Sequence, residues 1–349
     1  KKIIEGREDD IRPCVGATYC LDRIYEAGDA LCIHNAATGR ELTMPHTIPP
    51  AEKKRKVVIV GAGPAGLEAA RVAAERGHNV VVFEAQPDPG GQVRLTAQSP
   101  RRREMISIID WRMAQCAARD VEFHFNTWAE ADDVINQNPD VVIIATGGMP
   151  NTELLESGKD TPHVTTSWDI IAGDVKPADS ILIYDESGDH AALQAAEVAA
   201  NAGAKVEIMT PDRTFSAGVM AMNLVPYMRS LQDKDTTFTV ARRLLGVELR
   251  GNKLEAQIGT DYSDHSDIQE YDQVVVNYGT LPLDELYFDL KNLSSNGGAV
   301  DHDALVNGHP QNIVKNTDSQ FQLFRIGDAV SARNTHAAIY DALRLLKDI

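Results

Sequence analysis

The sequence predicts an α/β fold of two doubly wound domains, the second inserted in the first. Short, wholly apolar runs at Val57–Val60 and Val80–Phe83 are typical of parallel strands buried on both faces. The alanine-rich segment between them has helical composition, so the three pieces form one strand–helix–strand unit. A second unit of this kind follows at Ser180–Met209. Two such units in one chain predict two domains of related architecture.

The elements are expected in chain order. In the first unit, Leu67–Arg76 is a helix that Gly77 ends. In the second unit we expect a strand, a helix and a strand at Ile181–Tyr184, Ala191–Ala202 and Val206–Met209. Further strands are expected at Val141–Ala145, Val274–Asn277 and Phe324–Ile326, followed by a terminal helix at His336–Lys347.

Changes in composition predict the domain boundaries. The first fifty residues look irregular, hold three of the four cysteines and end in Ile48-Pro49-Pro50 before a charged run, which is typical of a linker. We therefore assign 1–50 to a cysteine-bearing linker segment, 51–165 with 280–349 to the first domain, and 166–279 to the inserted domain.

Composition excludes several classes of partner. The chain has 349 residues and a formal net charge of −17, so its surface repels nucleic acid and anionic lipid. Its longest apolar runs are far shorter than the ~20 residues that span a membrane. Four cysteines do not suggest a disulfide framework, and a reducing, cytoplasmic compartment is the simpler expectation. The chain begins at Lys1 without a methionine and looks like part of a longer protein, and a homo-oligomer is left open.

The strongest motif is the turn Gly61-Ala62-Gly63-Pro64-Ala65-Gly66 between the first strand and helix. Gly61 allows the tight turn, Gly63 lets a pyrophosphate approach the backbone, and Gly66 lets helix and strand pack closely. The phosphate then meets the N-terminus of the helix. Glu84 ends the second strand, where a carboxylate can accept hydrogen bonds from ribose hydroxyls. The sequence therefore predicts a Rossmann-like site for an adenine dinucleotide.

Two further segments favour FAD over NAD at this site. Gly90-Gly91-Gln92 offers bare backbone near the diphosphate and flavin, and Gly327-Asp328 could place a carboxylate near the ribityl chain and pyrophosphate. With these segments the sequence resembles the two-dinucleotide-binding-domain flavoproteins. The resemblance implies an FAD domain interrupted by an NAD(P)H domain, with bound ADP as the alternative to FAD. The cofactor-binding residues it assigns are Gly61, Gly63, Pro64, Ala65, Gly66, Glu84, Ala85, Gly90, Gly91, Gln92, Ala145, Thr146, Gly147, Gly327 and Asp328.

The second strand–helix–strand unit has lost the glycine fingerprint. Its turn, Asp185–His190, keeps only Gly188, and the carboxylates of Asp185, Glu186 and Asp189 crowd the place of a pyrophosphate. Its second strand ends in Met209-Thr210 without a ribose-binding acid. We therefore expect a degenerate NAD(P)-binding-like domain.

The N-terminal cysteines form a broken metal-binding pattern. Cys14, Cys20 and Cys32 would complete C-x2-C-x2-C-x11-C if Ala17 were a cysteine. That pattern resembles the segment holding a 4Fe–4S iron–sulfur cluster in the trimethylamine dehydrogenase and 2,4-dienoyl-CoA reductase family. The resemblance covers essentially the whole chain. It implies that Cys14, Cys20 and Cys32 are metal ligands, although Ala17 cannot coordinate iron. The sequence also leaves open a cluster with one open corner, a three-iron cluster, or free cysteines.

The resemblance also implies a function. The chain would be the C-terminal half of a flavoprotein oxidoreductase whose N-terminal barrel binds FMN. The motif Cys14–Arg23 and the segment Pro100–Arg112 look most like the N-methylproline and dimethylglycine demethylases, so an N-methylated amine is the expected substrate and an electron-transferring flavoprotein the expected acceptor. The resemblance places the substrate residues in the N-terminal barrel, and the catalytic residues stay unknown. The alternatives are an NAD(P)H-dependent flavin oxidoreductase and a non-catalytic module with structural ADP.

Overall fold

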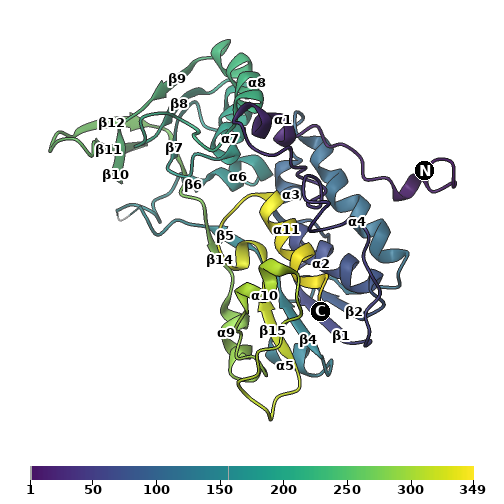
Figure 1. Ribbon diagram of the computed structural model, residues 1–349. Coiled ribbons are helices and arrows are strands. Elements are labelled where there is room, and N and C mark those ends of the chain that lie inside the picture. The colour runs from purple at the N-terminus through teal and green to yellow at the C-terminus, as the bar shows by residue number, and fades with distance from the viewer. Residues whose placement is uncertain (1, 156) are drawn as a thin grey trace. The chain divides into compact units, whose positions relative to one another are not determined.

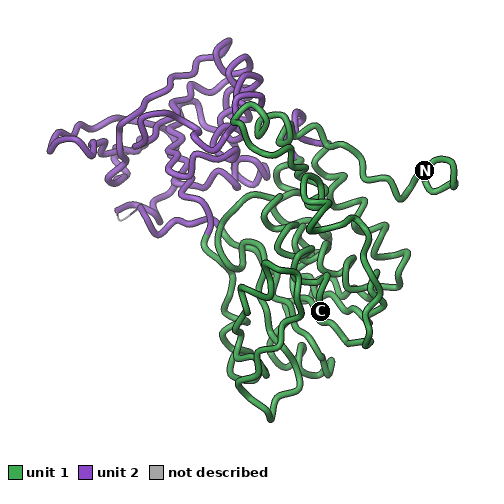
Figure 2. The backbone as a smooth tube through the Cα atoms, in the orientation of Figure 1, with its two compact units in different colours: residues 1–97, 104–149, 281–349 green, residues 98–103, 150–280 purple. Residues whose placement is uncertain are grey.

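The computed structural model describes residues 2–155 and 157–349, and the chain forms two compact units. Unit 1 comprises residues 1–97, 104–149 and 281–349, and unit 2 comprises residues 98–103 and 150–280 (Figure 2). The main boundaries between the two units lie between residues 149 and 150 and between residues 280 and 281. The boundaries predicted from the sequence lie between 165 and 166 and between 279 and 280. The segment 1–50 is part of unit 1. Residues 1 and 156 fall within predicted domains but lie outside the described residues.

Unit 1 contains a five-stranded parallel sheet in the order β15-β4-β1-β2-β3 (Figure 1). In a doubly wound sheet, ligands bind where neighbouring connections leave in opposite directions, here between β1 and β4. The strands span Lys56–Val60 (β1), Asn79–Phe83 (β2), Glu122–His124 (β3), Val141–Ile144 (β4) and Gln322–Arg325 (β15).

Alternate side chains of β1 enter two separate cores. Val57 and Ile59 pack in one hydrophobic cluster with helices α2, α4 and α11, whereas Val58 and Val60 pack in another with α5 and α9. The sheet is therefore covered on both faces, which is why its strands are apolar throughout. These helices span Pro64–Glu75 (α2), Ser107–Ala117 (α4), Ala131–Ile135 (α5), Glu285–Lys291 (α9) and Thr335–Leu346 (α11).

Four strands of unit 2 repeat the order of four strands in unit 1, because β13-β7-β8-β9 corresponds to β4-β1-β2-β3; the fifth strand comes first in the chain in unit 2 (β6) and last in unit 1 (β15). The parallel sheet of unit 2 runs β6-β13-β7-β8-β9, and helix α7 joins β7 to β8 as α2 joins β1 to β2. The strands span Val164–Thr166 (β6), Ser180–Asp185 (β7), Lys205–Met209 (β8), Thr236–Thr239 (β9) and Gln273–Asn277 (β13), and the helices span Ser167–Ala172 (α6), His190–Asn201 (α7) and Ala221–Gln232 (α8). Two doubly wound units confirm the predicted fold class.

Unit 2 also holds an antiparallel sheet that the sequence did not predict. It runs β10-β11-β12 and spans Arg243–Arg250, Lys253–Gly259 and Asp267–Tyr271. One face carries Val247, Leu254, Ala256 and Ile258 into the core of unit 2, and in β11 the alternate residues Lys253, Glu255 and Gln257 are polar. This half-buried alternation differs from the continuous apolar runs that identified the parallel strands.

The remaining elements are short. The first fifty residues are less irregular than predicted, because they contain a 3-10 turn at Glu8–Asp10 (η1) and helix α1 at Tyr19–Tyr25. The others span Gly91–Thr96 (α3), Arg103–Ile106 (η2), Gly148–Pro150 (β5), Thr280–Pro282 (β14), His302–Asn307 (α10) and Gly327–Ala329 (η3). Within 2–155 and 157–349, no helix combines the length and apolar character that a membrane span requires.

Candidate functional site

The turn between β1 and α2 needs each of its three glycines for a different reason. Gly61 has a φ of +104°, and a Cβ on it would lie 2.3 Å from the carbonyl oxygen of Ala145. A Cβ on Gly66 would lie 1.9 Å from the carbonyl oxygen of Gly61, so only glycine lets α2 pack this close to the turn. A Cβ on Gly63, in contrast, would meet nothing within 4 Å. The space beside Gly63 is open to a ligand.

The open side of Gly63 adjoins the N-terminus of α2. Gly63 is the N-cap residue in an extended conformation, and no side chain caps the helix. Pro64 occupies the first helical position, where its missing N–H costs nothing. The end of a twelve-residue helix with uncapped N–H groups carries positive potential. These residues therefore fit a diphosphate group.

Glu84, which follows β2, is hydrogen-bonded to the turn. Its Oε2 accepts the N–H of Ala62 over 2.7 Å, and its Oε1 accepts the N–H of Gln86 over 2.8 Å. The neighbouring Ala85 is exposed. Each carboxylate oxygen has a second acceptor position, so the predicted contact with ribose hydroxyls stays compatible with this geometry.

The second predicted glycine segment, Gly90-Gly91-Gln92, lies against the glycine turn at Gly61–Gly66. The N–H of Gly90 donates to the carbonyl oxygen of Ala62 over 2.9 Å, and a Cβ on Gly91 would lie 3.5 Å from the Cα of Gly63. Both glycines have positive φ angles, +132° and +50°. The chain after β2 therefore returns to the turn with bare backbone.

The C-terminal predicted segment reaches the same place. Gln92 donates a hydrogen bond from Nε2 to Oδ2 of Asp328 over 3.0 Å, and a Cβ on Gly327 would lie 3.0 Å from the Cβ of Ala65. The N–H of Arg333 donates to Oδ1 of Asp328 over 3.1 Å. Burial raises the pKa of Asp328 above its usual value, although these two hydrogen bonds act to lower it. Three segments far apart in sequence thus converge at the N-terminus of α2.

The predicted segment Ala145-Thr146-Gly147 continues from β4. The N–H of Ala145 donates to the carbonyl oxygen of Val60 over 2.8 Å, which places this segment beside the glycine turn. The hydroxyl of Thr146 donates to the carbonyl oxygen of Leu283, and the N–H of Leu283 donates to that of Gly147 over 3.0 Å. These residues join β4 to the chain that returns to β15.

The three predicted metal ligands are not gathered around one point. Cys14 and Cys20 are exposed and Cys32 is partly exposed. In the part of the chain that the structure describes, no three or more histidine, cysteine, aspartate or glutamate side chains form a group that could hold a metal ion. Ala17 stands at the fourth position of the pattern. As placed, these residues do not fit a four-cysteine cluster. Cys116 is buried, and burial raises the pKa of its thiol to about 12.

His34 is a packed residue that holds the cysteine segment. Its Nδ1 lies 3.0 Å from the carbonyl oxygen of Pro13, to which it donates, and its ring meets Trp111 edge-on at 5.6 Å. Burial, and then the charge of Arg112, lower the pKa of His34 to about 3. Its imidazole is therefore neutral at physiological pH.

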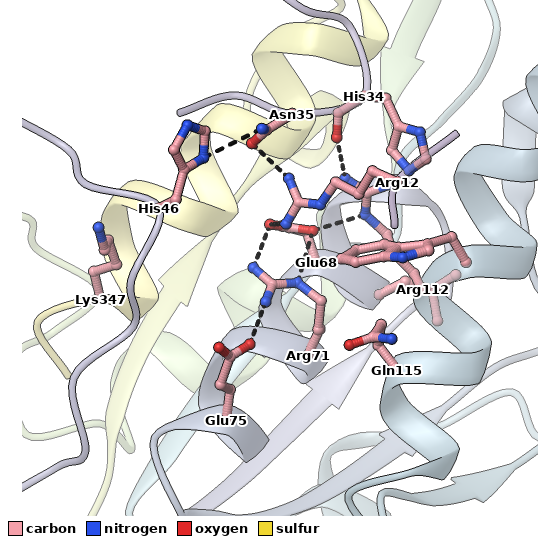
Figure 3. A network of polar contacts seen from close by, with 12 residues as sticks. Arg12, His34, Asn35, His46, Glu68, Arg71, Glu75, Arg112, Gln115 and Lys347 are labelled. Atoms are coloured by element: carbon pink, nitrogen blue, oxygen red, sulfur yellow. Dashed lines mark hydrogen bonds and ion pairs between the residues drawn. The ribbon is translucent and has the colours of Figure 1, made fainter. Parts of the chain in front are cut away.

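A buried ion cluster fastens the cysteine segment to α2 and α4 (Figure 3). Glu68 on α2 lies 2.7 Å from Arg71, 2.8 Å from Arg112 and 3.5 Å from Arg12. Burial opposes ionisation of Glu68, but the three guanidinium groups outweigh it and hold its pKa below the usual range. Arg112 also donates to the carbonyl oxygen of His34 over 2.9 Å. No local sequence pattern marks this cluster, because its members come from three separate segments.

A second link joins the segment to α11. Nδ1 of His336 lies 2.9 Å from the carbonyl oxygen of Cys32, and its Nε2 lies 3.2 Å from a guanidinium nitrogen of Arg40. The ring packs against Tyr19 at 5.1 Å and against Tyr340 at 6.2 Å. His336 therefore packs α11, the helix that follows Asp328, against the cysteine segment.

The sheet, the open glycine turn and the converging return segments are those of a dinucleotide-binding domain of the flavoprotein type. Residues 55–342 match the family described as pyridine nucleotide-disulphide oxidoreductase, and the chain belongs to this family.

Two curated relatives and one solved structure extend over essentially the whole chain. The chain is 69% identical to a probable N-methylproline demethylase of Rhizobium meliloti (strain 1021), covering 100% of this chain and 51% of the relative. It is 43% identical to an N,N-dimethylglycine/sarcosine dehydrogenase of Chromohalobacter salexigens, covering 99% and 52%. A 2-naphthoyl-CoA reductase, solved with 2-naphthoyl-CoA, superposes with a TM-score of 0.82 at 28% identity, covering 100% and 48%. The chain thus spans about half the length of these proteins.

Proposed function

We propose that this chain is the cofactor-binding and electron-transfer half of a flavin-dependent oxidoreductase that oxidises an N-methylated amine. The observation that carries the proposal is the convergence of Gly90–Gln92 and Gly327–Asp328 on the open turn at Gly63. The amine follows from the names of the two curated relatives. Bound flavin would supply the two-electron chemistry.

The cofactor of this chain is FAD in this proposal. The turn and the N-terminus of α2 would hold the diphosphate, and Glu84 would accept the adenosine ribose hydroxyls. Gln92 and Asp328, already hydrogen-bonded to each other, would lie toward the ribityl chain. ADP needs only the diphosphate and ribose contacts, so the converging third segment favours FAD over ADP.

The substrate site and the electron acceptor belong outside this chain. We place FMN and the amine site in an N-terminal barrel of the longer protein, because the chain matches only half of its relatives. An electron-transferring flavoprotein is the proposed acceptor. The four free cysteines agree with a reducing, cytoplasmic compartment.

Unit 2 is assigned to a degenerate NAD(P)-binding-like domain. It shares the order of four strands with unit 1, but its turn at Asp185–Asp189 carries carboxylates where the first turn has glycines. NAD(P)H is therefore not the proposed electron donor.

An iron–sulfur cluster on Cys14, Cys20 and Cys32 stays a separate prediction. Three thiolates with one open corner are the ligands this sequence offers. Iron and acid-labile sulfide, measured on the anaerobically purified full-length protein, test it. Stoichiometric iron that Cys20→Ala removes supports the cluster, and iron-free protein refutes it.

The second candidate is a reductase that takes electrons from NAD(P)H. The superposition with a 2-naphthoyl-CoA reductase favours a reductase reaction. Stopped-flow mixing of the full-length protein with N-methylproline, dimethylglycine or NADH separates the two. Flavin bleaching by an N-methyl amine and not by NADH supports our proposal, whereas bleaching by NADH alone overturns it.

A non-catalytic module with structural ADP is tested by the released ligand. The purified chain is denatured, and its nucleotide is identified by chromatography. FAD supports the proposal, and ADP from a colourless protein refutes the flavin assignment.

A further inference from the structure

The turn of unit 2 is filled by its own side chains. Asp185 ends β7 at the position that Gly61, the first glycine of the turn, takes in unit 1, and its side chain is fully buried. Oδ1 of Asp185 accepts the N–H of Gly188 over 2.9 Å and that of Ser187 over 3.2 Å. In a dinucleotide-binding turn, N–H groups of this kind are offered to the diphosphate.

A second carboxylate occupies the N-terminus of α7. Asp189 is the N-cap residue, and its Oδ1 accepts the N–H of Ala191 over 2.8 Å. Its Oδ2 accepts the hydroxyl of Ser187 over 2.8 Å. The equivalent residue of unit 1, Gly63, has no side chain and leaves the start of α2 uncapped. The two units thus differ at the point where a diphosphate would enter.

Asn277 holds the two carboxylates together. It lies opposite Asp185 in the pairing of β13 with β7, where the sheet order predicts a ligand site. Its Nδ2 donates to Oδ1 of Asp185 over 2.9 Å and to Oδ1 of Asp189 over 3.1 Å. Its Oδ1 accepts the buried hydroxyl of Ser167 over 3.0 Å, which fixes the orientation of the amide.

Glu186, the third carboxylate of the turn, points elsewhere. It lies 2.9 Å from Arg243 and accepts the hydroxyl of Tyr184 over 3.1 Å. Oδ2 of Asp185 is buried and has no hydrogen-bond partner among the described residues. A phosphate that approached the turn would therefore meet the carboxylates of Asp185 and Asp189, and not that of Glu186.

We propose that Asp185 and Asp189 fill the diphosphate position of unit 2 and thereby exclude NAD(P)H as an electron donor. Their carboxylates accept hydrogen bonds from the N–H groups that would otherwise bind the phosphates. They also place negative charge where the negatively charged phosphates would lie. They are specificity-determining residues, because they restrict the electron donor of the enzyme. This inference rests on the proposed assignment of unit 2 as a degenerate NAD(P)-binding-like domain.

Replacing Asp185 and Asp189 by residues that leave the diphosphate position of unit 2 open tests the inference. The 349-residue chain, saturated with FAD so that unit 1 is filled, is titrated with NADH and followed by nucleotide fluorescence and calorimetry. Wild type is expected to show no saturation at about 1 mM, whereas the double variant Asp185→Gly, Asp189→Gly binds at least about tenfold more tightly. The matched control Glu186→Gln removes a charge from the same turn and gives no binding.

A second variant covers the case in which the glycine variant does not fold. Asp185→Asn with Asp189→Ser keeps acceptors for the turn and the helix cap but removes both charges. It should bind NADH more weakly than the glycine variant and more tightly than wild type. A folded, FAD-loaded variant that binds no better than wild type overturns the inference and leaves the proposed function intact. Saturable NADH binding by wild type overturns the assignment of unit 2 as well.

Discussion

Gln92 and Asp328 share a hydrogen bond of 3.0 Å although they lie 236 positions apart in the chain. The bond joins α3, which begins within the second glycine segment, to η3, which follows β15. It shows how the doubly wound sheet gathers distant residues at one end of its strands.

Replacing Gln92 by alanine should weaken FAD binding. The change removes one of the hydrogen bonds that hold the Asp328 carboxylate in place, so we expect a loss of about 1–2 kcal/mol, or roughly five- to thirtyfold in Kd. Quenching of flavin fluorescence measures it. Gln86→Ala is the matched control, because that side chain is exposed and should leave Kd unchanged.

Gly63→Val should give a folded chain without nucleotide. A Cβ there meets nothing in the protein, and the φ of −72° suits any residue, but the side chain would fill the space beside the diphosphate. Flavin absorbance after purification reports the loss, and circular dichroism reports the fold. Gly66→Val provides the contrast, since its Cβ would lie 1.9 Å from the oxygen of Gly61 and should disrupt folding itself. Normal flavin content in Gly63→Val would show that the diphosphate lies elsewhere.

Glu68→Gln should destabilise unit 1 strongly. It leaves the buried guanidinium groups of Arg71 and Arg112 without their carboxylate, a change that costs about 3–5 kcal/mol in other buried ion clusters. Urea unfolding measures the free energy. Glu75→Gln is the control: its side chain is 30% exposed, so the loss should stay below about 1 kcal/mol. Equal losses of unfolding free energy in Glu68→Gln and Glu75→Gln would contradict the conclusion that the larger cost at Glu68 comes from its burial.

His34 should make the protein less stable in acid. Burial, and then Arg112, lower its pKa to about 3, so the folded state favours the neutral ring. The stability from this group is complete above the unfolded pKa of about 6.5 and falls with pH from there toward 3, by up to about 1.4 kcal/mol per pH unit. His34→Asn keeps a donor for the Pro13 carbonyl but cannot titrate, so the fall of Tm between pH 6.5 and 4 should become shallower. An unchanged slope would assign the acid sensitivity to other groups.

The sequence alone determined the fold class and the turn at Gly61–Gly66. Both depend on local patterns: apolar runs mark strands buried on two faces, and the glycine spacing is set by the turn itself. The antiparallel sheet β10-β11-β12 was not predicted, because its strands are buried on one face only and do not form continuous apolar runs.

Only the tertiary structure decided which distant residues meet. Local patterns do not encode the contact of Gln92 with Asp328 or that of Glu68 with Arg12, because the sheet order and helix packing create them. The same holds for the turn of unit 2. The sequence shows three carboxylates there. In the structure, Asp185 and Asp189 accept hydrogen bonds from backbone N–H groups of the turn, while Glu186 pairs with Arg243. Hydrogen bonding to backbone donors is directional, so the folded turn decides which carboxylates accept from them.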